Sequence, residues 1–297
     1  MIEGWFKSHS PSSKMGTGVL FIADDFGIDL GIERAVARLV ERDRLSGFSA
    51  LVTTDRWTEA APEARRLQPM LAVGLHLNLS LGHPLTRLPT LTVDGAFPPL
   101  RGLISVAVAG NAPLDGITNE FKAQIETFRD GVGALPDMID SHMHVHALPG
   151  VREAAIAAIR AFAFPVPPLV RVPADRVTRI LRRGLAVSRS LMVASLTSGF
   201  ASFLDDAGLP RNTSFSGITT LKSWSDITGE FARAMTYPGA RHLVICHPGD
   251  GATDEIATRR QAEFEALMAA DGLPNLLLRP RRLGRSGPID WSQWSGR

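Results

Sequence analysis

Short apolar runs alternate with amphipathic segments along most of the chain, and this alternation restricts the possible folds more than any other feature. Residues 18–23 (GVLFIA) form the first apolar run, and residues 30–44 follow it with apolar side chains at helical spacing. Further strands are expected at residues 48–53, 71–79, 137–142, 169–172, 214–218, 241–246 and 275–278. Further helices are expected at residues 57–67, 114–130, 151–162, 174–203, 223–235 and 254–269. Strands that are mostly apolar throughout are typical of a parallel sheet covered on both faces.

The number of strand-helix repeats predicts an α/β fold of the (β/α) barrel type, distorted or seven-stranded, in preference to an open doubly wound sheet. No glycine-rich dinucleotide fingerprint follows the first strand, so a Rossmann nucleotide site is not expected. We expect an extended or disordered N-terminal segment at residues 1–17 and a single domain at residues 18–297. The Pro- and Gly-rich residues 82–113 interrupt the repeats, either as a functional lid or as a solvated insertion.

Composition limits the classes of function. The net charge of +2 offers no electrostatic argument for nucleic acid binding. Cys246 is the single cysteine, which excludes an intrachain disulfide and fits a reducing compartment. No segment resembles a signal peptide, and no apolar run is long enough to span a bilayer. We therefore expect a cytoplasmic enzyme or binding protein without a transmembrane segment.

Three histidines and an aspartate alternate within residues 140–146 (DSHMHVH). An extended chain would place four of these side chains on one face, namely Asp140, His142, His144 and His146. Histidine is the commonest metal ligand in proteins, and alternate histidines on a strand can reach one ion. The segment therefore favours a metal or catalytic role over simple packing. By geometry alone, His142 and His144 are equally eligible ligands.

Reactive groups also follow several other expected strands, and in a parallel barrel they would gather at the carboxyl ends of the strands. These groups are Asp24, Asp25, His76, Asn78, Arg171 and His247. Each has a structural alternative: the aspartate pair could form a turn, His76 could be a hydrogen-bonded strand residue, and His247 could stabilise its Pro-Gly turn. For the helix that begins near Leu30, Asp29 is an available N-cap. Together with the histidine segment, however, these groups favour a catalytic metal site.

One carboxylate and two imidazoles would leave open positions on a divalent ion for water and substrate. Such an ion lowers the pKa of bound water and polarises a carbonyl oxygen. A neighbouring carboxylate can accept the proton from that water, and a histidine such as His247 can protonate the leaving group. By donor type, zinc, manganese, cobalt and nickel suit the set comparably.

Residues 174–203 carry five arginines, which are Arg176, Arg179, Arg182, Arg183 and Arg189. We expect them to form a solvated helix face, with a basic surface that guides substrate as the alternative. In the C-terminal tail, Trp291 and Trp294 are expected to pack back onto the body of the domain.

Four motifs, in this order, resemble those of the YdjC-like family of carbohydrate deacetylases. They are residues 23–27 (ADDFG), 74–76 (GLH), 140–146 (DSHMHVH) and 246–249 (CHPG). The resemblance covers roughly residues 19–278. It implies a metal-dependent hydrolase that removes the acetyl group from an N-acetylated amino sugar, oligosaccharide or sugar conjugate, so the expected partner is an N-acetylated sugar or sugar-lipid substrate. It also implies a barrel similar to that of the NodB-type deacetylases, and it suggests a homodimer.

The resemblance implies roles for individual residues. One divalent metal ion, Zn or Mg, would be ligated by Asp25, His76 and His142, and it is the family pattern that favours His142 over His144. The implied catalytic residues are Asp24 as general base, His247 as general acid, and Arg171, which would orient the base or the substrate. Weaker substrate-contacting roles fall to Asn78, His144 and His146.

The chain departs from many relatives at Ile28 and Asp29, where Leu-Ser is common, and in residues 82–113 and 174–203. Because loops over the rim of a barrel select the substrate, these departures leave the particular sugar open. Two other functions are also compatible with these residues. A metal-dependent phosphoester hydrolase would prefer two metal ions and a basic cradle. A non-catalytic metal- or sugar-binding protein would keep the fold without turnover.

Overall fold

A computed structural model describes residues 18–222, 226–284 and 287–294, so the expectation for residues 1–17 lies outside the described part. Seven parallel strands form one sheet in the order β5-β4-β3-β2-β1-β7-β6. They are β1 (Leu20–Phe26), β2 (Gly47–Ala50), β3 (Ala72–Leu77), β4 (Met138–Ser141), β5 (Leu169–Val170), β6 (Ser214–Ser216) and β7 (His242–Cys246). Every residue of these strands is buried, as expected for a sheet with both faces covered.

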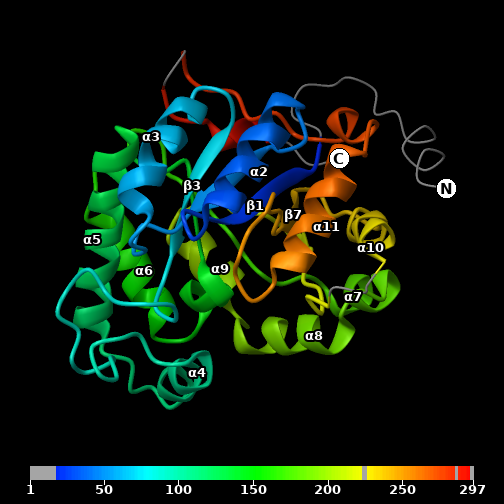
Figure 1. The fold of residues 1–297 in the computed structure, drawn as a ribbon. Helices are drawn as coiled ribbons and strands as arrows, with labels where there is room; N and C mark the ends of the chain where they lie inside the picture. The colour runs from blue at the N-terminus through cyan, green and yellow to red at the C-terminus, as the bar shows by residue number, and fades with distance from the viewer. Residues whose placement is uncertain (1–17, 223–225, 285–286, 295–297) are drawn as a thin grey trace.

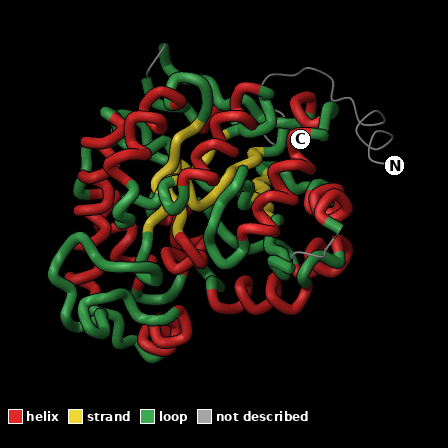
Figure 2. Tube along the Cα trace, viewed as in Figure 1, coloured by secondary structure: helices red, strands yellow, loops and turns green. Residues whose placement is uncertain are grey.

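Helices surround the strands, which lie in the middle of the molecule (Figures 1 and 2). The α-helices are α2 (Leu30–Glu41), α3 (Trp57–Leu67), α4 (Leu100–Val108), α5 (Leu114–Val132), α6 (Val151–Arg160), α7 (Val177–Arg183), α8 (Val187–Leu196), α9 (Phe200–Asp206), α10 (Ile227–Ala234) and α11 (Ala257–Met268). The 3₁₀ helices are η1 (His142–Ala147), η2 (Leu273–Asn275) and η3 (Trp291–Gln293). None of the described helices is both long enough and apolar enough to cross a membrane.

The two edges of the sheet, β5 and β6, approach each other and nearly close it. Val170 forms a parallel bridge with Arg211, just before β6, and the Val170 amide donates to the Pro210 carbonyl at 2.8 Å. The Asn212 side chain bonds both the amide and the carbonyl of Val172, at 2.7 and 2.9 Å. The fold is therefore a seven-stranded parallel half-barrel, which confirms the expected α/β barrel in its distorted form.

Two expectations about elements need correction, and a third segment contains a helix that the sequence did not predict. The last strand at residues 275–278 does not form, because η2 and Pro280 leave room for a single bridge, between Val19 and Leu277. Residues 82–113 contain the helix α4. The helical region 174–203 is divided into α7, α8 and α9, because Gly184 and Gly199 adopt left-handed backbone angles, with φ of 63° and 79°.

Two expectations about local packing are confirmed. The Asp29 side chain accepts from the Gly31 amide at 2.6 Å and caps α2. Both Trp291 and Trp294 are buried against the body of the domain, and the Trp291 indole donates to the Asp137 carbonyl at 2.8 Å. Both tryptophans belong to the buried cluster that also contains Leu20 and Ile22 of β1 and Met138 of β4.

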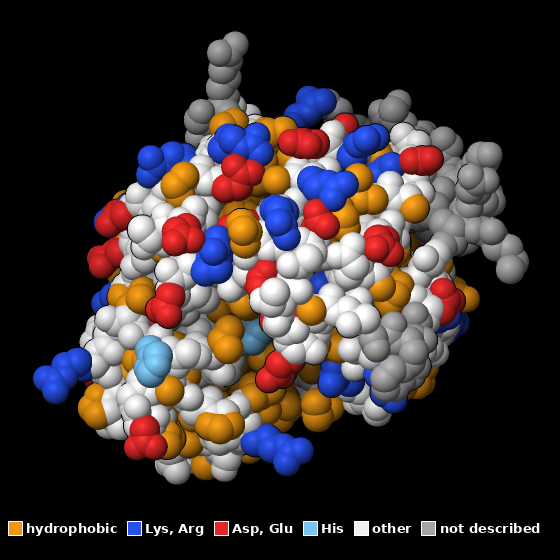
Figure 3. Space-filling model, viewed as in Figure 1, with side chains coloured by type: hydrophobic (Ala, Val, Ile, Leu, Met, Phe, Trp, Pro, Cys, Tyr) orange, Lys and Arg blue, Asp and Glu red, His pale blue; other side chains and the backbone are white. Residues whose placement is uncertain are grey.

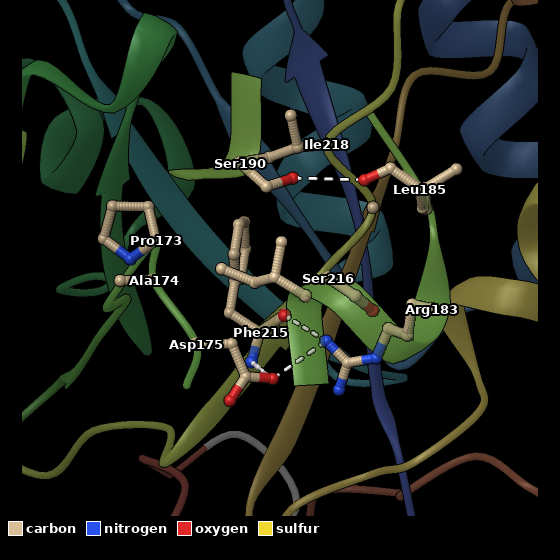
Figure 4. Close-up of a pocket in the computed structure, with 11 residues that line it drawn as sticks. Pro173, Ala174, Asp175, Arg183, Leu185, Ser190, Phe215, Ser216 and Ile218 are labelled. Atoms are coloured by element: carbon tan, nitrogen blue, oxygen red, sulfur yellow. Dashed lines mark hydrogen bonds and ion pairs between the residues drawn. The ribbon is translucent and has the colours of Figure 1, made fainter. Parts of the chain in front are cut away.

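The arginines of residues 174–203 do not all lie on a solvated face. Arg176, Arg182 and Arg189 are exposed, as expected, but the Arg183 side chain is buried. It pairs with the Asp175 carboxylate at 2.8 Å and donates to the Phe215 carbonyl at 2.9 Å, beside a small cavity (Figure 4). A buried guanidinium requires such partners, so Arg183 fastens α7 to β6.

The ring of His242, a residue of β7, is buried next to the Arg183–Asp175 ion pair. Its nitrogens lie 2.8 Å from the Ser214 hydroxyl and 3.1 Å from the Ser216 hydroxyl, and Nε2 lies 3.0 Å from the Ala234 carbonyl. Burial and the nearby Arg183 guanidinium lower the pKa of His242 to about 4. His242 is therefore neutral in the folded protein at neutral pH.

This burial makes stability depend on pH. Between pH 6.5 and pH 4 the unfolded chain binds a proton at His242 and the folded chain does not, so protonation favours unfolding as the pH falls. The free energy of unfolding should fall by about 1.4 kcal/mol per pH unit from this ring across that window. Urea unfolding of the wild type and His242→Gln should therefore show a shallower pH dependence in the variant. Equal slopes in the two proteins would contradict a neutral buried His242.

Candidate metal centre

The strands β1, β3 and β4 are parallel, so their carboxyl ends lie on the same side of the sheet. The candidate site is built there. His76 near the end of β3 pairs in register with Asp140 of β4. The register between β1 and β2 shifts after Ala23, and Asp25 has a positive φ of 70°. This irregularity at the end of β1 allows the neighbouring carboxylates of Asp24 and Asp25 to face different partners.

The structure brings Asp25, His76 and His142 together. Their potential ligand atoms all lie within 4.8 Å of one another. Asp25 Oδ1 is 3.1 Å from His142 Nδ1 and 3.5 Å from His76 Nε2. One carboxylate oxygen and two imidazole nitrogens form a donor set that suits zinc and related divalent ions and leaves positions free. The three residues therefore fit one divalent metal ion.

The Asp140 carboxylate orients His76. Its Oδ1 lies 2.6 Å from His76 Nδ1, and the Ser49 hydroxyl lies 3.0 Å from the same nitrogen. Because a carboxylate can only accept, Nδ1 carries a proton and Nε2 is directed toward Asp25. Burial alone would lower the pKa of His76, but the Asp140 and Asp24 carboxylates outweigh it and raise that pKa to about 10. A cation bound at Nε2 would replace the second proton.

Arg171 lies behind the site and holds Asp24. The fully buried guanidinium donates to both Asp24 oxygens, at 2.7 and 2.6 Å, and also pairs with Asp140. Burial would raise the pKa of Asp24, but Arg171 and His76 lower it to about 2. Asp24 is therefore an ionised carboxylate beside the candidate ligands.

A second group of potential ligands, Asp24, His76 and Asp140, also lies within 4.8 Å. The Arg171 guanidinium pairs with both carboxylates of this group. A second cation there would have to displace a fixed positive charge, so the arrangement favours one metal ion rather than two.

The expectation that residues 140–146 remain extended is wrong. Strand β4 ends at Ser141 and η1 follows, with Met143 and His144 in left-handed conformations at φ of 54° and 61°. The three histidines therefore do not share a face. His146 turns into the core, where Nδ1 lies 2.6 Å from the Ser141 hydroxyl and Nε2 lies 2.8 Å from the Arg171 carbonyl.

His144 and Asn78 also have distinct surroundings. His144 lines the cavity of the candidate site and packs edge-on against Phe215, and burial together with Arg171 holds its pKa well below the usual value. The Asn78 side chain is fully buried and bonded to Thr53 and to the turn at Leu81, so it shapes the loop after β3 and does not reach the cavity. Like Asn78, the buried His146 is not among the residues that line this cavity.

His247 follows β7 directly and lines the same cavity as Asp24 and the three candidate ligands. Its backbone amide donates to Glu263 at 2.6 Å, which anchors the Pro-Gly turn to α11. This placement allows His247 to reach a substrate held beside Asp24.

The sequence reasoning missed Arg260 on α11. Its Nη2 donates to Asp25 Oδ2 at 2.7 Å, and its Nε donates to Asp254 at 2.7 Å. Burial would raise the pKa of Asp25, but His142, His76 and Arg260 hold it well below the usual value. Arg260 thus occupies one Asp25 oxygen and leaves the other facing the histidines. No local pattern distinguishes it from the other arginines of the chain.

We expect Arg260→Met to raise the dissociation constant for zinc by about 10- to 100-fold, as loss of a residue that orients a ligand commonly does. Competition titration against a chromogenic chelator would measure the change. Arg260→Lys keeps the charge and should lose less affinity. Arg38→Met, which breaks the exposed pair of Arg38 with Asp250, is the matched control. Unchanged affinity in folded Arg260→Met would show that Arg260 does not support Asp25.

Comparison with known proteins places this site in a family. The family model described as YdjC-like protein matches residues 18–273. The chain belongs to the YdjC-like family. The YdjC-like match includes every residue of the candidate site, from Asp24 to Arg260. It confirms the resemblance that the four sequence motifs indicate.

Curated relatives of this YdjC-like chain include two named chitooligosaccharide deacetylase. The Citrobacter koseri protein is 33% identical over 187 residues, which cover 62% of this chain and 68% of that protein. The Salmonella typhimurium protein is 33% identical over 162 residues, which cover 54% and 63%. The match to the Salmonella protein thus spans less than two thirds of its length.

A solved structure from Enterococcus faecalis V583, described provisionally as a cellobiose-phosphate cleavage protein, has a TM-score of 0.65 to this chain. It is 22% identical, and the match covers 89% of this chain and 97% of that one. At this identity, the likeness concerns the fold alone.

Proposed function

We propose that this YdjC-like protein is a metal-dependent deacetylase. Its substrate is an N-acetylated amino sugar, oligosaccharide or sugar conjugate, and its products are acetate and a free amine. The observation that carries the proposal is one ionised carboxylate, Asp24, beside the Asp25, His76 and His142 donor set in one cavity. The relatives named chitooligosaccharide deacetylase support the class of substrate.

In this proposal each residue has a defined role. Asp25, His76 and His142 would hold a divalent ion, zinc or magnesium, which would supply Lewis acidity toward the amide carbonyl and lower the pKa of water. Asp24 accepts a proton from the attacking water, and Arg171 keeps the Asp24 carboxylate ionised and oriented. His247 donates a proton to the amine nitrogen as the carbon–nitrogen bond breaks.

The preferred test measures product release from metal-loaded protein. We expect acetate from N-acetylglucosamine or di-N-acetylchitobiose, no phosphate from p-nitrophenyl phosphate, and loss of activity on dialysis against a chelator. Phosphate release without acetate release would replace the proposal with phosphoester hydrolysis. A metal-loaded protein that releases neither product would indicate a non-catalytic binding protein.

A further inference from the structure

Helix α11 carries three buried charged side chains beside the candidate site, those of Arg259, Arg260 and Glu263. Figure 3 shows other charged side chains of both signs at the surface, where water hydrates them. Taking a charge out of water is costly, and a buried ion pair often stabilises a fold no more than apolar residues of similar volume would. The contact of Arg260 with Asp25 accounts for one of the three charges. The other two require a separate explanation.

The Glu263 carboxylate joins Arg259 to the turn that follows β7. Its Oε1 accepts from Arg259 Nε at 2.6 Å, and its Oε2 accepts from the His247 amide at 2.6 Å. The Arg259 guanidinium also pairs with Glu230 of α10 at 2.6 Å. Figure 1 shows α11 next to α10, against which it packs. Two helices therefore fix the carboxylate that holds the His247 backbone.

The Glu263 side chain takes the place of a strand partner for this amide. Strand β7 pairs with β1 as far as Cys246, and the next amide, that of His247, donates to Glu263. Two residues further along, the Gly249 amide donates to the Arg260 carbonyl at 3.0 Å. Both hydrogen bonds fasten the His-Pro-Gly turn to α11.

The imidazole ring of His247 depends on these backbone contacts for its position. Among the residues that the structure describes, the ring has no hydrogen-bond partner, although His247 lines the cavity with Asp24. A general acid must lie within hydrogen-bond distance of the atom that it protonates, and a displacement of about 1 Å can lower the rate about a hundredfold. The group that fixes the backbone of His247 therefore controls whether its ring can act.

We propose that Glu263 is a positioning residue for proton donation by His247. It fixes the His247 backbone and thereby the ring that donates a proton to the amine nitrogen as the carbon–nitrogen bond breaks. This inference rests on the proposed deacetylase function. The described hydrogen bonds of Glu263 go to His247 and Arg259 and not to a candidate ligand, so its replacement should leave the metal in place.

The test measures zinc-loaded Glu263→Gln on two substrates. Di-N-acetylchitobiose has an amine leaving group that must be protonated, whereas 4-nitrophenyl acetate releases a phenolate that needs no proton. Glutamine presents N–H groups to one of the two donors that Glu263 now accepts from, so the turn should shift. We expect kcat for acetate release from the sugar to fall by about 10- to 100-fold, with KM, zinc content and ester hydrolysis within about twofold of the wild type. Glu265→Gln, on the exposed face of the same helix, is the matched control and should change neither rate.

A double variant separates positioning from a purely structural role. Adding Glu263→Gln to His247→Ala should lower kcat for the sugar by less than about a further twofold, because the ring that Glu263 positions is already absent. Glu263→Asp keeps the charge beside Arg259 and shortens the side chain. It should show the same selective loss and serves as the test if thermal unfolding shows that Glu263→Gln does not fold.

Equal losses on the two substrates, or wild-type kcat in folded Glu263→Gln, would overturn the inference and leave the deacetylase proposal intact. Wild-type kcat in His247→Ala, or a full additional loss in the double variant, would overturn it in the same way. If the wild type does not hydrolyse the ester, the double-variant comparison decides. If the wild type releases no acetate from the sugar, the deacetylase proposal fails and the inference fails with it.

Discussion

Replacing His142 by alanine is expected to remove the bound divalent metal and to lower kcat/KM for acetate release by at least about a thousandfold. In the proposed mechanism the metal would contribute several kcal/mol of transition-state stabilisation, and it would be lost when one of its three proposed ligands is removed. His142 is the most informative of the three ligands to change. Its side chain is 22% exposed and its described hydrogen bond is to Asp25, so the fold should tolerate alanine.

Asp25→Ala and His76→Ala should give the same loss with an added cost in stability, because each leaves a buried charged partner behind, Arg260 or Asp140. Metal content by mass spectrometry and thermal unfolding would separate the two effects. His83→Ala removes an exposed loop histidine and should retain both metal and activity. Full metal content in folded His142→Ala would reject His142 as a ligand, and His144→Ala would then be the variant to examine.

Replacing Asp24 by asparagine is expected to retain the metal and to lower kcat by about 10²- to 10⁴-fold, the usual contribution of a general base. Asparagine has the same shape and can accept a hydrogen bond from Arg171, but it cannot take a proton. The Arg171 guanidinium keeps its contact with Asp140, so the charge behind the site is not left without a partner.

Asp29→Asn is the matched control for Asp24→Asn. Asp29 lies five residues along the chain and caps α2, a role that asparagine fills equally well. It should show wild-type kcat and metal content. Asp24→Asn with one equivalent of metal and wild-type kcat would reject Asp24 as the base, whereas loss of metal in that variant would place Asp24 among the ligands.

The strands and their order along the chain were predictable because strands that are buried on both faces consist of apolar runs in the sequence. The run GVLFIA predicts β1, and RHLVIC predicts β7, since a strand covered on both faces is apolar throughout. Residues 275–278 carry the same signal without forming a strand. Apolar composition reports burial, and the backbone partners that make a strand come from the rest of the fold.

The alternation of histidines in residues 140–146 did not predict the backbone conformation after β4. Alternating histidines look extended, but Met143 and His144 adopt left-handed angles that non-glycine residues rarely take. As a result His142 faces Asp25, and His146 bonds Ser141 and the Arg171 backbone instead of facing the cavity.

The supporting contacts of the site depend on tertiary structure. Asp140 was visible in the histidine segment, but its bond to His76 follows from the register of β3 and β4. Arg260 is 235 residues from Asp25 in sequence, and only the tertiary fold, in which α11 packs against α2, brings them together. Local sequence therefore indicated the reactive groups, and the fold determines how they are held.

In the proposed site, Asp25, His76 and His142 together hold one divalent cation next to Asp24. Anomalous diffraction at the zinc edge from crystals of the zinc-loaded protein tests it most directly. The expected result is a single peak about 2.0–2.2 Å from one Asp25 oxygen and from one nitrogen each of His76 and His142. A peak elsewhere in the cavity, or none at these residues, would contradict the assignment.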